Sequence, residues 1–227
     1  MSRTEVTRIL CAGLLVMALT TACAGCSSST ASSVPTDKAA ETPATTSSEA
    51  SASASAVPAT PGSEPLHVSA YKVSGNEQVK VDTNRGTFTI ELFPQGAPNT
   101  VATFLELAGS RFYDGIKFHR VESGFVIQAG DPQTKDPVID PQLYGTGGPG
   151  FRLKAEFNGN KHLRGTIAMA RAQDPDSAGS QFYITLAPQP TLDNQYTVFG
   201  KVVSGMDVVD AIVVGDTIKS MAIVRAP

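Results

Sequence analysis

Residues 118–132 read FHRVESGFVIQAGDP, a run that combines an arginine, a large aromatic ring and a glutamine in one glycine-punctuated strand. Arg120 carries a fixed fork of donors that stays charged at any working pH. Gln128 offers a donor and an acceptor together, and Phe125 offers an apolar surface. These are the parts of a site that can handle an amide group without covalent chemistry. Arg120, Phe125 and Gln128 are therefore the candidate catalytic residues.

Short alternating segments on both sides of this run predict a mainly β domain. From His67 onward the chain has about 160 residues, a usual size for one compact domain. A helix is expected from Ala97 to Gly109, with Pro98 in its first turn, and a second over residues 206–213. Short strands at this density suggest a closed barrel. Strands are expected at residues 79–83, 87–92, 118–128, 165–169, 181–186, 196–202 and 218–224, the first two joined as a hairpin.

Residues 1–22 have the pattern of a secretory signal peptide, in which two arginines precede an apolar run from Ile9 to Leu19. The run is about half of the roughly 20 apolar residues that cross a bilayer, which favours cleavage over a membrane-spanning anchor. The sequence Leu-Thr-Thr-Ala-Cys at residues 19–23 resembles a bacterial lipobox. It predicts lipidation of Cys23, with Cys26 as a second candidate and plain secretion as the alternative.

Residues 23–65 are rich in Ser, Ala, Thr and Pro, and no aromatic residue occurs between Ser27 and Pro65. This composition cannot bury enough apolar surface to offset the cost of ordering the backbone, so we expect a disordered linker. The folded domain is expected at residues 66–227. A diacyl group on the linker would hold it at the cell membrane, on the extracytoplasmic face, and membrane contact is expected through this anchor only.

Charge and cysteine content exclude several classes of function. The net charge is −3, and the leader contributes +1, so the mature chain carries −4 and has no electrostatic footprint for nucleic acid. All three cysteines, Cys11, Cys23 and Cys26, precede the predicted domain. No disulfide, thiol nucleophile or thiolate metal site is therefore expected in it.

The three histidines do not suggest a metal site or a general base. His67 and His162 are too far apart along the chain to suggest that they bind one metal ion. His119 is adjacent to Arg120, but side chains alternate along a strand, so it is expected on the opposite face and in a structural role. We expect neither a metal nor a cofactor.

The 118–132 run resembles the central signature of the cyclophilins, the cyclosporin-binding family of peptidyl-prolyl cis-trans isomerases. Other blocks agree: residues 145–150 look like the family's glycine loop, residues 167–172 like its peptide-pairing strand, and residues 177–184 like its Gly-Ser-Gln-Phe-Phe block. The resemblance covers residues 79–224. It implies a closed eight-stranded antiparallel barrel capped by two α-helices.

Matched position by position, the resemblance implies a larger set of site residues. Besides the three catalytic candidates, the substrate-binding residues would be Val126, Ala170, Arg171, Gln181, Tyr183, Leu192 and Tyr196. Four of these replace the family's commoner residues: Val126 stands for methionine, Arg171 for asparagine, Tyr183 for phenylalanine and Tyr196 for histidine. Thr191 stands where many eukaryotic members have a tryptophan, so weak cyclosporin binding is implied.

The resemblance implies an isomerase that accelerates rotation about X-Pro bonds, and the leader indicates that its substrates are exported polypeptides. Arg120 is the candidate donor to the prolyl nitrogen, and a monomer is expected. The main alternative is a chaperone or binding module that grips proline-containing segments, with incidental turnover. A structural lipoprotein with a lost site is a third alternative. The presence of Arg120, Phe125 and Gln128 together favours the enzyme.

Overall fold

The computed structural model describes residues 64–225. The predicted signal peptide, Cys23 and nearly all of the predicted linker lie outside the described residues. Within the described range the chain forms eight strands, two α-helices and four short 3-10 helices. The described part of the chain contains no helix with the length and apolar character needed to cross a bilayer.

The strands are β1 (Glu77–Thr83), β2 (Gly86–Leu92), β3 (Arg120–Val121), β4 (Val126–Ala129), β5 (Thr166–Met169), β6 (Phe182–Thr185), β7 (Val198–Ser204) and β8 (Ile218–Arg225). The α-helices are α1 (Pro98–Gly109) and α2 (Met206–Asp210). The 3-10 helices are η1 (Pro132–Lys135), η2 (Pro141–Leu143), η3 (Pro175–Ser177) and η4 (Pro190–Leu192). These elements confirm the predicted β1–β2 hairpin and the predicted span of α1, whereas α2 is shorter than expected.

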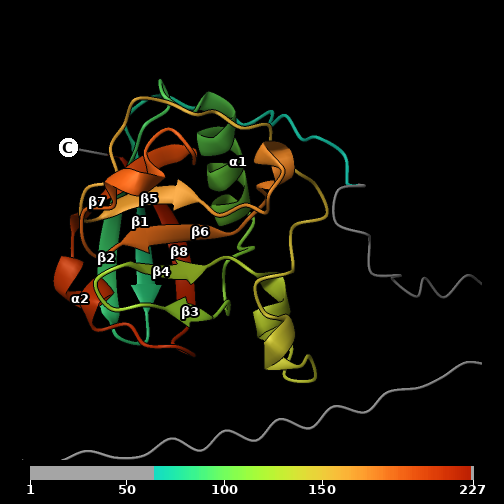
Figure 1. Cartoon of the computed structure of the whole chain (residues 1–227), viewed down its shortest axis with the longest axis vertical. Helices are drawn as coiled ribbons and strands as arrows, with labels where there is room; N and C mark the ends of the chain where they lie inside the picture. The colour runs from blue at the N-terminus through green and yellow to red at the C-terminus, as the bar shows by residue number, and fades with distance from the viewer. Residues whose placement is uncertain (1–63, 226–227) are drawn as a thin grey trace, which may run out of the picture. The chain divides into compact units, whose positions relative to one another are not determined.

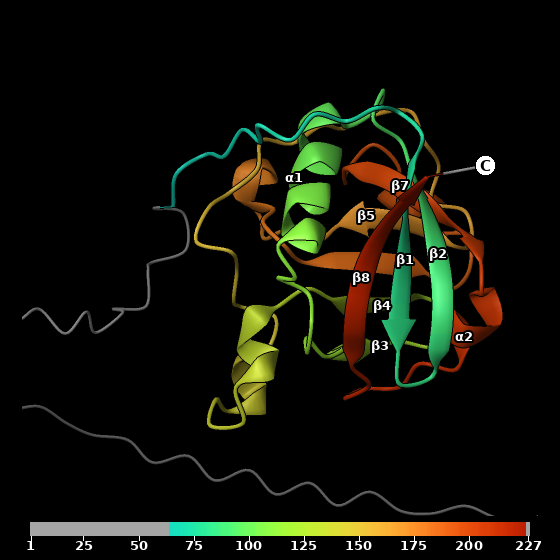
Figure 2. The same cartoon turned by 180° about the vertical axis from the view of Figure 1, so that it is seen from behind.

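All eight strands belong to one antiparallel sheet in the order β3-β4-β6-β5-β7-β2-β1-β8. The sheet curls around a core, with α1 packed against β8 and α2 against β2 (Figure 1). The reverse view shows β8, β1 and β2 side by side, with the two helices at different ends of the sheet (Figure 2). The mainly β, eight-stranded fold with two helices is as predicted.

The predicted closure of the barrel is not confirmed, because the sheet is open and its outer strands are β3 and β8. Among the described residues, β3 and β8 do not pair with each other. The residues just before these two strands form the contacts across the seam. An isolated bridge joins Lys117 to Thr217, and the Phe118 N–H donates to the Asp216 carbonyl at 2.8 Å. The half-barrel is therefore held together at this seam by loop backbone.

The single strand predicted over residues 118–128 is wrong. The segment instead forms a hairpin, in which β3 turns into β4 through residues 122–125. Gly124 has φ +71°, a left-handed conformation that glycine adopts without steric cost. The hairpin places Arg120 directly opposite Gln128, an arrangement that one continuous strand could not give.

The main core lies between the sheet and α1. Alternation along β1 buries Val79 and Val81 completely, as the period of two requires. From α1, Phe104 enters an aromatic cluster with ring centres 5.3 Å from Tyr113, 5.7 Å from Phe182 and 5.0 Å from Phe199. This cluster fixes the inner faces of β6 and β7, whose outer faces contribute to the site described below.

The first described residues pair through their backbone with the segment between η2 and β5. Leu66 forms a parallel bridge with Arg152, and the Arg152 N–H donates to the Pro65 carbonyl at 2.9 Å. The Arg152 Nε–H also donates to the Glu64 carbonyl at 3.0 Å. Glu64, the first of the described residues, is therefore already in contact with the domain.

Gly130 provides a test of how tightly β4 packs beside β6. It has φ +99°, and a Cβ there would lie 2.8 Å from the Gln181 Cα and closer still to the Ser180 carbonyl oxygen. We expect Gly130→Ala to lower the free energy of unfolding by about 2–5 kcal/mol, from left-handed strain and overpacking together. Urea unfolding measures this loss of stability.

Gly124→Ala is the matched control, because Gly124 also has a positive φ but no atom lies within 4 Å of a Cβ there. The free energy of unfolding is expected to fall by about 1–2 kcal/mol in this variant. Equal losses in the two variants would contradict the crowding argument.

Candidate active site

The β3–β4 hairpin presents the guanidinium of Arg120 at the surface, where two neighbours restrain it. Its Nη1 donates to Gln128 Oε1 at 3.3 Å, and its Nε donates to Glu122 Oε1 at 2.8 Å. The guanidinium carbon lies 5.6 Å from the centre of the Phe125 ring. The structure thus brings together the three predicted catalytic residues.

Glu122 is a site residue that the sequence analysis missed. Its Oε1 lies 2.7 Å from Arg120 Nη2, so one carboxylate oxygen contacts two nitrogens of the same guanidinium. Both side chains are about half exposed. The pattern that could have indicated this pair is the spacing of two residues, which places both side chains on one face of a strand.

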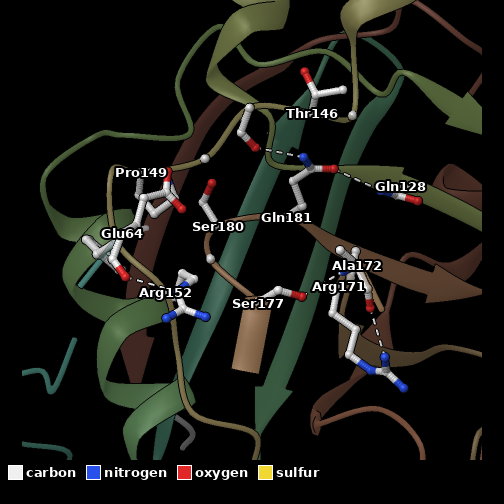
Figure 3. A pocket seen from close by; sticks show the side chains of 16 residues that line it. Glu64, Gln128, Thr146, Pro149, Arg152, Arg171, Ala172, Ser177, Ser180 and Gln181 are labelled. Atoms are coloured by element: carbon white, nitrogen blue, oxygen red, sulfur yellow. Dashed lines mark hydrogen bonds between the residues drawn. The ribbon is translucent and has the colours of Figure 1, made fainter. Parts of the chain in front are cut away.

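Two glutamines continue the polar contacts from Arg120 into the body of the domain. Gln128 Nε2 donates to Gln181 Oε1 at 2.9 Å, and Gln181 Nε2 donates to the Gly147 carbonyl at 2.8 Å. Figure 3 shows Gln181 reaching between Gln128 and the loop beside Thr146. Each amide is oriented by its partner, so Arg120 is connected to the glycine loop by a chain of hydrogen bonds.

An apolar hollow lies next to Arg120 on the outer face of β4 and β6. Val126 and Tyr183 are buried and form a small cluster separate from the main core. The full lining consists of Arg120, Phe125, Val126, Gln128, Ala170, Arg171, Tyr183, Leu192 and Tyr196. Nine of the ten predicted site residues therefore surround one cavity, and the tenth, Gln181, contacts Gln128 from the neighbouring pocket of Figure 3.

Arg171 lies between the hollow and that neighbouring pocket, but its guanidinium is turned back onto the domain. It stacks 4.8 Å from the centre of the Tyr196 ring. Its Nε donates to the Gln195 carbonyl at 3.0 Å, and its Nη1 to the carbonyls of Ala172 and Gln173. Arg171 thus forms part of the wall through its packing on Tyr196.

A fully buried carboxylate holds the glycine loop in place. Asp131 accepts from the N–H groups of Gly145 at 2.6 Å, Gly147 at 3.1 Å and Gln133 at 2.8 Å. A Cβ on Gly147 would collide with Asp131, so the close approach requires glycine there. Because the Gly147 carbonyl accepts from Gln181, Asp131 supports the polar chain from the inside.

His119 lies beside this loop rather than in the hollow. Its two ring nitrogens are shielded from solvent and have no hydrogen-bond partner among the described residues. Burial lowers the pKa of His119 below its ordinary value, although the charge of Asp131 partly opposes this. Burial thus favours the neutral form of the imidazole.

The sequence analysis assigns no role to His162, yet the structure places it directly behind the hollow. It is 1% exposed, and its Nε2 lies 2.9 Å from the Tyr183 hydroxyl. Its Nδ1 lies 3.1 Å from Asp193 Oδ1, and its backbone N–H donates to the same oxygen at 2.9 Å. The hollow is thus backed by a buried polar contact.

These contacts make a prediction for the pH dependence of stability. Hydrogen bonds from the backbone and ring of His162, aided by Lys161, lower the pKa of Asp193 to about 2. Because the folded-state pKa lies below the unfolded one, the stabilisation is present above about pH 4 and is lost as the pH falls toward 2. Asp193→Asn should therefore be less stable than the wild type near neutral pH, with the gap narrowing between about pH 4 and pH 2. Urea unfolding across this range measures the gap, and a gap that stays constant would contradict the argument.

Comparison with known proteins agrees with this geometry. A family model described as cyclophilin type peptidyl-prolyl cis-trans isomerase/CLD matches residues 78–226. A peptidyl-prolyl cis-trans isomerase of Helicobacter pylori (strain ATCC 700392 / 26695) is 42% identical over 163 residues, which cover 68% of this chain and 94% of that protein. Peptidyl-prolyl cis-trans isomerase B of Bacillus subtilis (strain 168) is 45% identical over 135 residues, which cover 59% of this chain and 87% of that protein.

Solved structures show the same fold. A crystal structure of a cyclophilin type peptidyl-prolyl cis-trans isomerase from Cryptosporidium parvum, in the presence of the dipeptide Ala-Pro, superposes with a TM-score of 0.58 at 30% identity. The match covers 66% of this chain and 99% of that chain. The chain belongs to the cyclophilin family of peptidyl-prolyl cis-trans isomerases. Its enzyme class is that of an isomerase.

Proposed function

We propose that this protein accelerates rotation about X-Pro bonds in exported polypeptides, with Arg120 as the donor to the prolyl nitrogen. Rotation faces a barrier of about 18–20 kcal/mol, because resonance gives the C–N bond partial double-bond character. Twisting the amide breaks this resonance and localises a lone pair on the nitrogen. A donor aimed at that nitrogen therefore stabilises the twisted transition state more than either planar ground state.

The observation that carries the proposal is the guanidinium of Arg120 at the rim of an apolar hollow. A guanidinium has five N–H groups. Among the described residues, Glu122 and Gln128 accept from three of these N–H groups. Two N–H groups are left for a substrate. Because Glu122 and Gln128 already hold the Arg120 side chain, it loses less conformational entropy when it binds the prolyl nitrogen.

The remaining site residues would hold the substrate. Phe125, Val126, Leu192 and Tyr196 offer the proline ring an apolar seat on which it stays fixed while the preceding residue rotates. The Ala170 N–H donates to the Gln181 carbonyl at 2.9 Å, so Ala170 would pair with an extended peptide through its own carbonyl.

Isomerisation of a proline-containing tetrapeptide by the full chain tests the activity. Uncatalysed exchange takes tens to hundreds of seconds, so catalysis is readily distinguished from background. A rate well above background supports the enzyme. Peptide binding without acceleration would overturn this proposal in favour of a binding module or chaperone for proline-containing segments.

We also propose that Cys23 carries a lipid that anchors the protein on the extracytoplasmic face of the cell membrane. The support is the lipobox-like sequence at residues 19–23, which lies outside the described residues. Labelling cells with a palmitate analogue tests this. Loss of label in Cys23→Ala but not in Cys26→Ala is expected, and the reverse pattern would move the anchor to Cys26.

Weak cyclosporin binding and a monomeric state stay predictions. Thr191 lies exposed in η4 and offers no indole to the drug. Titration of the protein with cyclosporin measures the first of these predictions, and sedimentation measures the second.

A further inference from the structure

The contacts of His162 connect two walls of the apolar hollow. Tyr183 comes from β6, and its hydroxyl meets His162 Nε2. Leu192 ends η4, and Asp193, the next residue, meets His162 Nδ1. The His162 carbonyl also accepts from the Gln189 N–H at 2.7 Å, at the other end of η4. His162 therefore joins η4 to β6 behind the hollow.

The hydrogen-bond donors in this contact follow from chemistry. An ionised carboxylate only accepts, so His162 Nδ1 carries the ring proton and donates to Asp193. In the neutral imidazole Nε2 is then an acceptor, and the Tyr183 hydroxyl donates to it. Burial raises the pKa of Tyr183, so its hydroxyl keeps this proton. With the protons placed in this way, each polar side-chain atom of Asp193, His162 and Tyr183 has a partner.

Aromatic packing stiffens the same cluster. The rings of His162 and Tyr183 are nearly parallel, at 13°, with centres 6.0 Å apart. Tyr196 meets Tyr183 edge-on, at 5.6 Å and 88°. A shift of Tyr183 would therefore disturb both the polar contact behind the hollow and the ring that faces it.

We propose that His162 is a positioning residue that sets the width of the hollow and thereby its selectivity for a five-membered ring. The inference rests on the proposed function, in which the hollow seats the proline ring. It applies to this chain in particular, because Tyr183 stands where the family resemblance expects phenylalanine, which has no hydroxyl to bind His162.

The test compares two substrates, a prolyl tetrapeptide and its pipecolyl homologue, whose ring has six members. Tyr183→Phe keeps the ring but removes the donor, so the hollow can widen. The ratio of kcat/KM for the prolyl over the pipecolyl substrate is expected to fall about three- to tenfold, the range that one neutral hydrogen bond is worth. A purely structural role would lower both values equally and leave the ratio unchanged, which would overturn the inference.

Two variants of His162 dissect the contact. Asparagine places an amide near Nδ1, so His162→Asn should keep the Asp193 bond, lose the Tyr183 bond and match Tyr183→Phe. Glutamine places an acceptor near Nε2, so His162→Gln should preserve the wild-type ratio better. The double variant Tyr183→Phe with His162→Asn should change the ratio no further than either single change, because both remove the same bond. A fully additive effect would contradict this.

Controls separate this inference from the proposed function. Lys161→Ala removes only an exposed partner of Asp193, at 3.2 Å, and should leave the ratio unchanged. If the wild type fails to isomerise the prolyl peptide, the proposed function fails; if it is active but the ratio is insensitive to Tyr183→Phe, only the inference fails. Nitrogen-15 spectra of the wild type offer an independent check, since a proton found on Nε2 instead of Nδ1 would overturn the arrangement.

Discussion

Replacing Arg120 by alanine is expected to lower kcat/KM for a prolyl tetrapeptide by about 10²–10³-fold, the usual cost of removing one preorganised donor to developing charge. The ground-state amide has little lone-pair density on its nitrogen, so the loss should fall mainly on kcat. The affinity for the planar peptide should change little, because the apolar wall of the hollow remains. A direct isomerisation assay that follows both substrate isomers measures the two parameters.

Arg120→Lys provides the matched variant. It keeps the charge but loses the planar fork that contacts Glu122 and Gln128 together, so an intermediate rate is expected. Arg111→Ala serves as a control for removing an arginine elsewhere, since Arg111 is largely exposed and, among the described residues, forms an ion pair with Asp114 alone. If Arg120→Ala were as fast as the wild type, the donor assignment would be wrong.

Replacing Asp131 by alanine is expected to lower the free energy of unfolding by about 3–6 kcal/mol. The carboxylate is fully buried and accepts from three backbone N–H groups, each of which would lose its partner at about 1–2 kcal/mol, in the lower part of the usual range. Urea unfolding measures the loss. Activity should fall as well, because the loop that carries Gly147 supports Gln181 and, through Gln128, Arg120.

Asp140→Ala is a close control for this change. Like Asp131, Asp140 precedes a proline at the start of a 3-10 helix and accepts from the N–H two residues later. It is exposed, however, and holds no second loop. Its loss should cost about 0.5–2 kcal/mol, the usual value of an N-cap. Similar losses in both variants would show that the buried contacts with the glycine loop add nothing.

Local patterns predicted most of the fold. The β1–β2 hairpin and α1 follow from alternation, a turn sequence and a proline in the first helical turn, all of which act over a few residues. The β3–β4 hairpin was missed because Phe125 and Val126 continue the apolar character of the segment and mask the turn at Gly124. The open seam could not be predicted either, since it depends on how far the sheet curls.

The site was predictable only in part, for a related reason. Arg120, Phe125 and Gln128 lie within one short run, and the family resemblance supplied the rest of the lining. The connections between residues were invisible, because they join distant parts of the chain. Gln128 meets Gln181 across 53 positions, and His162 meets Tyr183 and Asp193 across 21 and 31 positions. No spacing rule relates such residues before the fold is known.

The hairpin that carries Arg120 also affects the order in which the site can assemble. Arg120 and Gln128 are only eight positions apart, so bringing them together closes a short loop at a small cost in chain entropy. The hollow instead requires β6 and η4, which must be brought from far along the chain. An incompletely folded copy could therefore already have its donor in place while it still lacks a seat for proline. The ability to retain a substrate would then be acquired only with the last long-range contacts of the domain.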